Sequence, residues 1–136
     1  LRDQQMVRVV VGVPITGQLE QILCQLVRFV LHRGRLDDFR SLMHAMVEST
    51  LAEAGAQAYE WFITEDGTTC HICERYVDSE AAMVHLGTFG STFAERFLSC
   101  VEPTGFSVYG HPSDEVRGVL DGFGAVYMGS FGGFAR

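Results

Sequence analysis

Three side chains able to transfer a proton lie close together in the middle of the sequence: Glu74, Tyr76 and His85. Glu74 and Tyr76 are two residues apart in a β-rich run, and on a strand such residues point to the same side of the sheet. His85 follows in an apolar helical segment, and its pKa near neutrality suits it to accept a proton from a phenolic hydroxyl. The alternative is that each is a packed side chain with a satisfied hydrogen bond. We expect His85 to be a base or proton shuttle, with Tyr76 and Glu74 orienting a substrate.

Aromatic side chains flank this group in the sequence. Trp61, the only tryptophan, and Tyr59 share one face of a predicted strand and are suited to stacking on an aromatic ligand. A second apolar set recurs at helical spacing and is expected to form the wall of the same pocket; it comprises Phe89, Phe93, Phe97 and Met83. The alternative for both sets is packing in the core or at a dimer interface.

The four cysteines do not suggest a metal or redox centre. Cys70 and Cys73 form a C-x-x-C pair, but residues three apart on a strand point to opposite faces. The chain has no second C-x-x-C pair, and its cysteines are too few and too scattered for a secreted disulfide scaffold. We therefore expect no metal ligands.

Hydrophobic periodicity and turn signals predict the elements that position these side chains. Asp66-Gly67 between two β-rich runs is a strong hairpin signal, and Asp78 is a candidate N-cap. Gly55 is expected to end the first helix, and Gly87 and Gly90 to interrupt the second. The predicted strands are 22–32, 57–64, 68–76, 106–109 and 126–128, and the predicted helices are 36–54, 80–101 and 113–120.

The order strand, helix, hairpin, helix, strand is that of a ferredoxin-like split βαβ domain of the α+β class. Such a domain has a four-stranded antiparallel sheet with both helices on one face. The run Tyr59-Glu60-Trp61-Phe62-Ile63 is apolar on both faces, so the second sheet face should also be covered. A second copy is the economical cover, which predicts a homodimer in the form of a dimeric α/β barrel.

Composition excludes several classes of partner. The formal net charge is −7 and the chain contains no lysine, so binding to nucleic acid is not expected. The apolar stretch at residues 7–15 is short and interrupted by Arg8, Gly12 and Pro14, which argues against a membrane span. With no signal peptide recognisable at the start, we expect a cytoplasmic protein.

Three short segments carry a family resemblance: 54–61 (AGAQAYEW), 73–82 (CERYVDSEAA) and 83–86 (MVHL). They resemble the entry to strand two, the exit from strand three and the helical histidine of the antibiotic biosynthesis monooxygenase family of dimeric α/β barrels. The resemblance covers about residues 27–109, and it implies the ferredoxin-like fold.

The resemblance also implies an activity. Members of this family are cofactor-free oxygenases in which the anion of a small aromatic substrate, such as a quinol, an anthrone or a polyketide-like phenol, itself reduces molecular oxygen. No metal or flavin is then required. Some members place an asparagine near the substrate, and this chain has no asparagine. The alternative function is a non-catalytic ligand-binding or assembly module of the same fold.

The chain divides into three predicted parts. Residues 1–20 form an N-terminal extension, 21–110 the ferredoxin-like domain, and 111–136 a C-terminal extension. Because the predicted domain is complete by Tyr109, we expect residues 126–134 to cross to a partner and the segment after Leu120 to stabilise the dimer.

Overall fold

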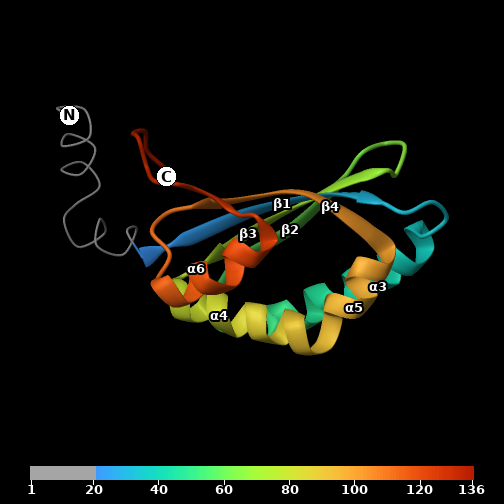
Figure 1. Cartoon of the computed structure of the whole chain (residues 1–136), viewed down its shortest axis with the longest axis horizontal. Helices are drawn as coiled ribbons and strands as arrows, with labels where there is room; N and C mark the ends of the chain where they lie inside the picture. The colour runs from blue at the N-terminus through green and yellow to red at the C-terminus, as the bar shows by residue number, and fades with distance from the viewer. Residues whose placement is uncertain (1–20) are drawn as a thin grey trace.

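The computed structural model describes residues 21–136, so the predicted extension at residues 1–20 lies outside the described part of the chain. The strands form one sheet and the helices form a layer beside it (Figure 1). The strands are β1 (Leu23–Leu31), β2 (Ala56–Ile63), β3 (Thr69–Tyr76), β4 (Val101–Tyr109) and β5 (Val126–Met128). The helices are α3 (Leu36–Leu51), α4 (Ser79–Thr88), η1 (Phe89–Phe93), α5 (Ala94–Cys100), α6 (Asp114–Leu120) and η2 (Asp121–Phe123).

The sheet has five strands in the order β2-β3-β1-β4-β5, one more than predicted. The first four strands pair antiparallel as expected for the ferredoxin-like fold. The fifth, β5, pairs parallel to β4 of the same chain. Parallel neighbours need a crossover connection, and α6 supplies it. Val126–Met128 therefore extends the sheet of its own chain, whereas we expected residues 126–134 to cross to a partner. That the segment after Leu120 stabilises a dimer stays a prediction.

The helices lie on one face of the sheet, as predicted (Figure 1). Alternate residues of β3 are buried beneath them, namely Cys70, Ile72, Glu74 and Tyr76. The opposite face carries half-buried and exposed side chains, including Leu26, Val30 and Phe62. The inward face of the sheet is thus where a site between sheet and helices must be built.

The first helix ends earlier than predicted, and Gly55 has a different role. The helix α3 stops at Leu51, and its C-cap Ala52 stays in the right-handed helical region. A side chain at Gly55 would collide with the methyl group of Ala81 on α4. Gly55 is therefore needed for the close approach of the α3–β2 loop to α4, and its carbonyl accepts a 2.9 Å hydrogen bond from the Val77 amide.

The second helical segment is continuous where glycine interruptions were expected. A π-helical turn at Phe89–Phe93 joins α4 to α5. The segment then ends at Cys100, and Pro103 and Gly105 lie within β4 rather than before it. Both flank an irregularity in the β1–β4 pairing, which is where a strand tolerates proline and glycine.

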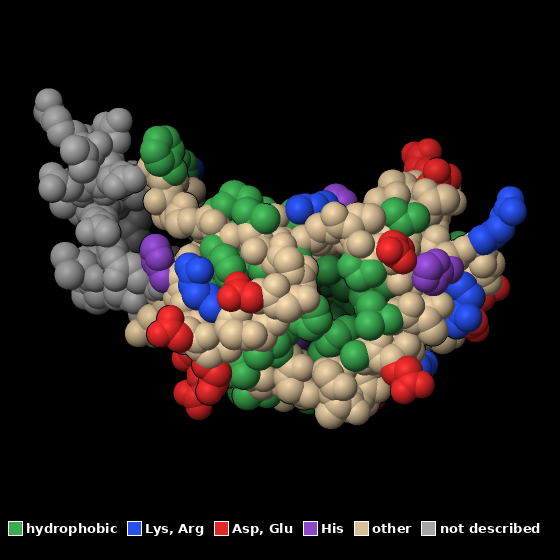
Figure 2. Space-filling model, in the orientation of Figure 1, with side chains coloured by type: hydrophobic (Ala, Val, Ile, Leu, Met, Phe, Trp, Pro, Cys, Tyr) green, Lys and Arg blue, Asp and Glu red, His purple; other side chains and the backbone are tan. Residues whose placement is uncertain are grey.

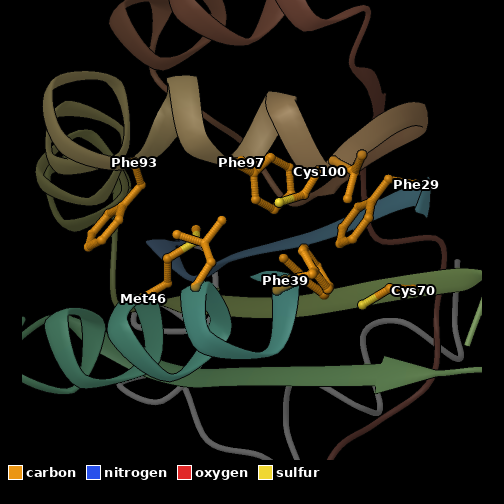
Figure 3. Packing of buried hydrophobic residues seen from close by; sticks show 10 residues of the cluster. Phe29, Phe39, Met46, Cys70, Phe93, Phe97 and Cys100 are labelled. Carbon is orange, nitrogen blue, oxygen red and sulfur yellow. The ribbon is translucent and has the colours of Figure 1, made fainter. Parts of the chain in front are cut away.

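Two clusters of buried side chains form the core. The first lies between α3, α5 and the sheet, with the Phe29, Phe39 and Phe97 rings packed edge to face or tilted (Figure 3). The second, at the other end of the sheet, contains Leu23, Tyr76, Ala82, Val108, Val116 and Leu120. Since Val116 and Leu120 belong to α6, the C-terminal residues contribute to the same core as the ferredoxin-like elements.

Candidate functional site

His85 is buried between α4 and the sheet. The helix begins at the predicted cap, where the Asp78 carboxylate accepts a 2.9 Å hydrogen bond from the Ala81 amide. Two turns later the His85 ring, with the residue 6% exposed, packs against the rings of Tyr59 and Tyr76 at 5.2 Å each. His85 is thus held by its own helix on one side and by two aromatic residues of the sheet on the other.

Both nitrogens of His85 face carboxyl groups. Nδ1 lies 3.2 Å from Oε1 of Glu53, and Nε2 lies 3.5 Å from Oε1 of Glu74. The same Glu74 oxygen accepts a 2.5 Å hydrogen bond from the Tyr76 hydroxyl. These four residues form one connected row, which we call the Glu53–His85–Glu74–Tyr76 chain.

Burial sets the protonation of this chain. It raises the pKa of Glu74 to about 7 and lowers the pKa of His85 to about 4, because the charged form of each loses its hydration. The pKa of Glu53 is raised for the same reason. Burial and the nearby Glu74 raise the pKa of Tyr76 and Tyr59 well above the usual value, so both phenols keep their protons.

The contacts in this row define a short path for one proton. A neutral imidazole that donates from Nδ1 to the Glu53 carboxylate presents the lone pair of Nε2 toward Glu74. Near neutral pH, Glu74 is close to half protonated. A proton on Glu74 can reach His85 along this contact, but it is more stable on Glu74, because the pKa of His85 is about 4 and that of Glu74 is about 7.

The Glu53–His85–Glu74–Tyr76 chain does not form a metal site. Glu53 and Glu74 approach opposite nitrogens of one imidazole, so the three side chains share no common point for an ion. Within residues 21–136, no group of three or more histidine, cysteine or acidic side chains is arranged to hold a metal.

All five predicted aromatic residues lie in or against the first core cluster, and one of them, Tyr59, contacts His85. Trp61 packs against Tyr59 at 5.7 Å and Phe39 at 5.5 Å, and Phe97 contacts both Trp61 and Phe89. Phe93 is buried in the same apolar cluster. The residue that departs from the set is Met83, which packs with the second core cluster around Tyr76.

Two polar residues of the site were not predicted from the sequence. Glu53 follows α3 and is 32 residues from His85, so nothing local in the sequence linked them. Gln25 is buried on β1 directly opposite Glu74 in the β1–β3 pairing. A signal for Gln25 did exist, because it is a polar residue at an inward position of an otherwise apolar strand.

The cysteines behave as the sequence predicts. Cys70 is buried beneath the helices, Cys73 lies on the opposite sheet face, and all four cysteines are free thiols. The C-x-x-C pair therefore does not converge.

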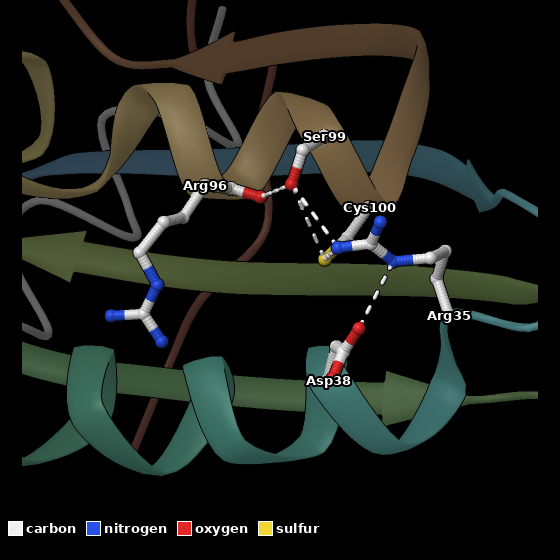
Figure 4. Close-up of polar contacts among 5 residues, drawn as sticks. All are labelled: Arg35, Asp38, Arg96, Ser99 and Cys100. Carbon is white, nitrogen blue, oxygen red and sulfur yellow. Dashed lines mark hydrogen bonds and ion pairs between the residues drawn. The ribbon is translucent and has the colours of Figure 1, made fainter.

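A separate hollow of about 180 Å³ lies between the start of α3 and the end of α5. Some of its polar groups are already paired: Arg35 forms a 3.3 Å ion pair with Asp38 and donates to Ser99 (Figure 4). It is lined by Arg35, Asp38, Ser41, Leu42, Arg96, Ser99 and Cys100, at the opposite end of α3 from Glu53. This hollow contains none of the predicted site residues.

Hydrophobic side chains reach the surface over the helix–sheet interior. In Figure 2 they line a recess between the positions of α5 and α6 in Figure 1. This face offers an apolar surface on the side of the sheet where the Glu53–His85–Glu74–Tyr76 chain lies. No helix in residues 21–136 is long and apolar enough to cross a membrane.

The fold and the site together define the class of this protein. It is a ferredoxin-like domain with a buried chain of carboxyl and imidazole groups between the sheet and the helices. The sequence profile of the antibiotic biosynthesis monooxygenase family matches residues 22–103, more than half of the chain. The chain belongs to this family. No curated protein sequence gives a significant match.

Solved structures confirm the fold. MupZ from Pseudomonas fluorescens superposes with a TM-score of 0.77 at 22% identity, covering 85% of this chain and 90% of MupZ. A conserved protein from Methanosarcina mazei Go1 gives 0.61 at 17% identity, covering 70% of this chain and 97% of its own. SnoaB, a cofactor-independent oxygenase from Streptomyces nogalater, gives 0.59 at 14% identity, with coverages of 68% and 95%.

Proposed function

We propose that this protein is a cofactor-independent monooxygenase that oxidises a small aromatic substrate, such as a quinol, an anthrone or a polyketide-like phenol, with molecular oxygen. The observation that carries the proposal is the buried Glu53–His85–Glu74–Tyr76 chain in a member of the antibiotic biosynthesis monooxygenase family. The resemblance in fold to a cofactor-independent oxygenase supports it.

Glu74 receives the substrate proton. Both His85 nitrogens are already opposed by carboxyl groups, so a phenolic hydroxyl reaches the chain at Glu74 more directly than at His85. A carboxyl group with a pKa of about 7 is well matched to general-base catalysis near neutral pH. His85 then serves as a shuttle that carries the proton only in passing, because its pKa of about 4 lies below that of Glu74. Tyr76 fixes the Glu74 carboxyl group, and Trp61 and Tyr59 stack beside the substrate ring.

The remaining chemistry belongs to the substrate anion. An anthrone anion transfers an electron to oxygen, and the two radicals combine to a peroxide anion. This anion takes back the proton held by Glu74 to become a hydroperoxide, and loss of water leaves a new carbonyl. One oxygen atom enters the product and the other leaves as water, so the substrate supplies all the electrons. An apolar enclosure that excludes water protects the intermediates, and the Phe89, Phe93 and Phe97 rings are suited to this.

Oxygen uptake with a panel of hydroquinones and anthrones tests the proposal. We expect uptake above the uncatalysed rate that falls at least tenfold in His85→Ala and in Glu74→Gln, since a general base contributes roughly 100-fold or more. We also expect the rate to rise with pH through about 7, because the ionised form of Glu74 is the base.

The folded state of both variants is checked by circular dichroism. Background uptake by wild type and variants alike across the panel would contradict the proposal and favour a ligand-binding module of the same fold.

A further inference from the structure

Gln25 carries a buried donor that the fold does not use. The residue is 2% exposed, and its Nε2 has no hydrogen-bond partner among residues 21–136. Leaving a buried donor unpaired is destabilising, and the great majority of such groups in folded proteins are paired. Gln25 therefore does not owe its place on β1 to a structural hydrogen bond from its amide nitrogen.

The strand register places this amide beside the proposed base. Gln25 on β1 is paired with Glu74 on β3, and Glu74 is paired with Tyr59 on β2. Directly opposed residues of antiparallel strands point to the same face, with Cβ atoms roughly 5 Å apart. Tyr59, Glu74 and Gln25 thus form one row beneath the helices, and His85 contacts the first two of them.

Two other donors near Glu74 are already engaged. The Tyr76 hydroxyl donates to Glu74, and Nδ1 of His85 faces Glu53. Although Gln25 is opposite Glu74, its amide makes no hydrogen bond to that carboxyl group. The Gln25 amide is therefore a free donor beside the group that takes the substrate proton.

We propose that Gln25 is a substrate-binding residue whose amide nitrogen donates a hydrogen bond to the phenolic oxygen of an aromatic ligand and holds that ligand as its anion. The phenolic O–H bond breaks, the proton goes to the Glu74 carboxylate, and the electron pair stays on the oxygen that Gln25 binds. The assignment rests on the proposed function for the identity of this oxygen, but binding requires no oxidation.

Gln25→Met separates this role from a structural one. Methionine keeps the length and approximate volume of the side chain but removes the unpaired donor. In the free protein the variant should be as stable as wild type or more stable, because a buried unpaired group has been removed. A residue retained for structural hydrogen bonding would instead lower the melting temperature when replaced.

The experiment compares the full-length wild type with Gln25→Met and with Gln57→Met, which makes the same chemical change at an exposed position of β2. The probes are 4-nitrophenol and nitrobenzene, which differ by the hydroxyl group and are titrated without oxygen. Binding is measured by calorimetry and by the fluorescence of Trp61, and the nitrophenolate absorbance reports the ionisation of the bound ligand.

We expect Gln25→Met to weaken 4-nitrophenol binding roughly 10- to 100-fold, the effect of one hydrogen bond to a charged group, and to leave nitrobenzene binding unchanged. The fraction bound as anion should fall as well, while Gln57→Met matches wild type. Equal loss for both probes, no loss for either, a lowered melting temperature, or wild type that fails to bind 4-nitrophenol would each overturn the assignment. Because these titrations involve no oxidation, they test the role of Gln25 in binding even if the protein proves not to be an oxygenase.

Discussion

At the scale of single residues, the site depends on one proton between Glu74 and His85, whose pKa values are shifted in opposite directions. The pKa of Glu74 is raised from 4.5 to about 7, and that of His85 is lowered from 6.5 to about 4. On folding, Glu74 gains affinity for a proton over nearly the same pH range in which His85 loses it. The two contributions to the pH dependence of stability therefore nearly cancel in wild type.

Single substitutions should reveal the contribution of each residue to the pH dependence of stability. In Glu74→Gln only the His85 shift remains: the unfolded chain binds more protons than the folded one between pH 6.5 and about 4, so stability is lost as the pH falls through that range. In His85→Gln only the Glu74 shift remains, and stability is lost as the pH rises from 4.5 to about 7. Each change should amount to about 3 kcal/mol, from the cost of roughly 1.4 kcal/mol per pKa unit.

Urea denaturation of the three proteins at several pH values measures these slopes. The other titrating groups are common to all three proteins, so they cancel when each variant is compared with wild type. Parallel pH profiles for wild type and both variants would mean that neither group is shifted.

The sequence predicted part of this site. Glu74 and Tyr76 were expected on one side of a strand because period two governs strands, and His85 followed a recognisable N-cap. The partner of Nδ1 could not be predicted, since Glu53 lies in a loop and meets His85 only through the packing of α4 on that loop. The roles assigned to these residues stay predictions until activity is measured.

At the scale of elements, the position of α4 is set by its contact with the α3–β2 loop. A methyl group at Gly55 has no room beside Ala81, whereas one at Gly87, an exposed position of α4, meets nothing within 4 Å. Gly55→Ala should therefore cost about 1–3 kcal/mol of unfolding free energy through overpacking. Gly87→Ala should add about 0.5–1 kcal/mol, because alanine is the better helix former.

The two variants make the same chemical change, so thermal or urea denaturation of both separates packing from helix propensity. His85 shares α4 with Ala81, and Gly55→Ala should accordingly also displace the histidine from Glu53 and reduce activity. Equal stability changes in the two variants would contradict the role given to Gly55.

Local signals were enough to predict the type and order of the first four strands and the helices between them, but not all of their ends. The Asp66-Gly67 turn and the caps mark ends of elements that depend on neighbours in sequence. The π-helical turn at Phe89–Phe93 and the partner of β5 were not predicted, because both are decided by packing: the first keeps the phenylalanine side chains on the core, and the second adds a parallel strand through a crossover. Long-range pairing leaves little trace in a single sequence.

At the scale of the whole molecule, the sheet face opposite the helices has the character of a surface that another copy covers. Phe62 is 54% exposed and Val30 39%, and Leu26 lies on the central strand β1, paired with Cys73 on β3 and Ser107 on β4. Arg28 on the same face donates to Ser107. Apolar residues mixed with paired polar groups suit a two-fold interface, in which each residue meets the same surface of its partner.

We predict a homodimer formed by this face. Leu26→Glu should convert it to a monomer, because the substitution places a charge in the centre of the apolar surface while leaving the helix-side core of each copy intact. The matched control is Leu51→Glu at the end of α3, where the leucine is 85% exposed and on the helix side. Sedimentation velocity over a range of protein concentrations should give dimers for wild type and Leu51→Glu and monomers for Leu26→Glu. A monomeric wild type, or a Leu26→Glu variant that still sediments as a dimer, would show that the open sheet face is not where two copies meet.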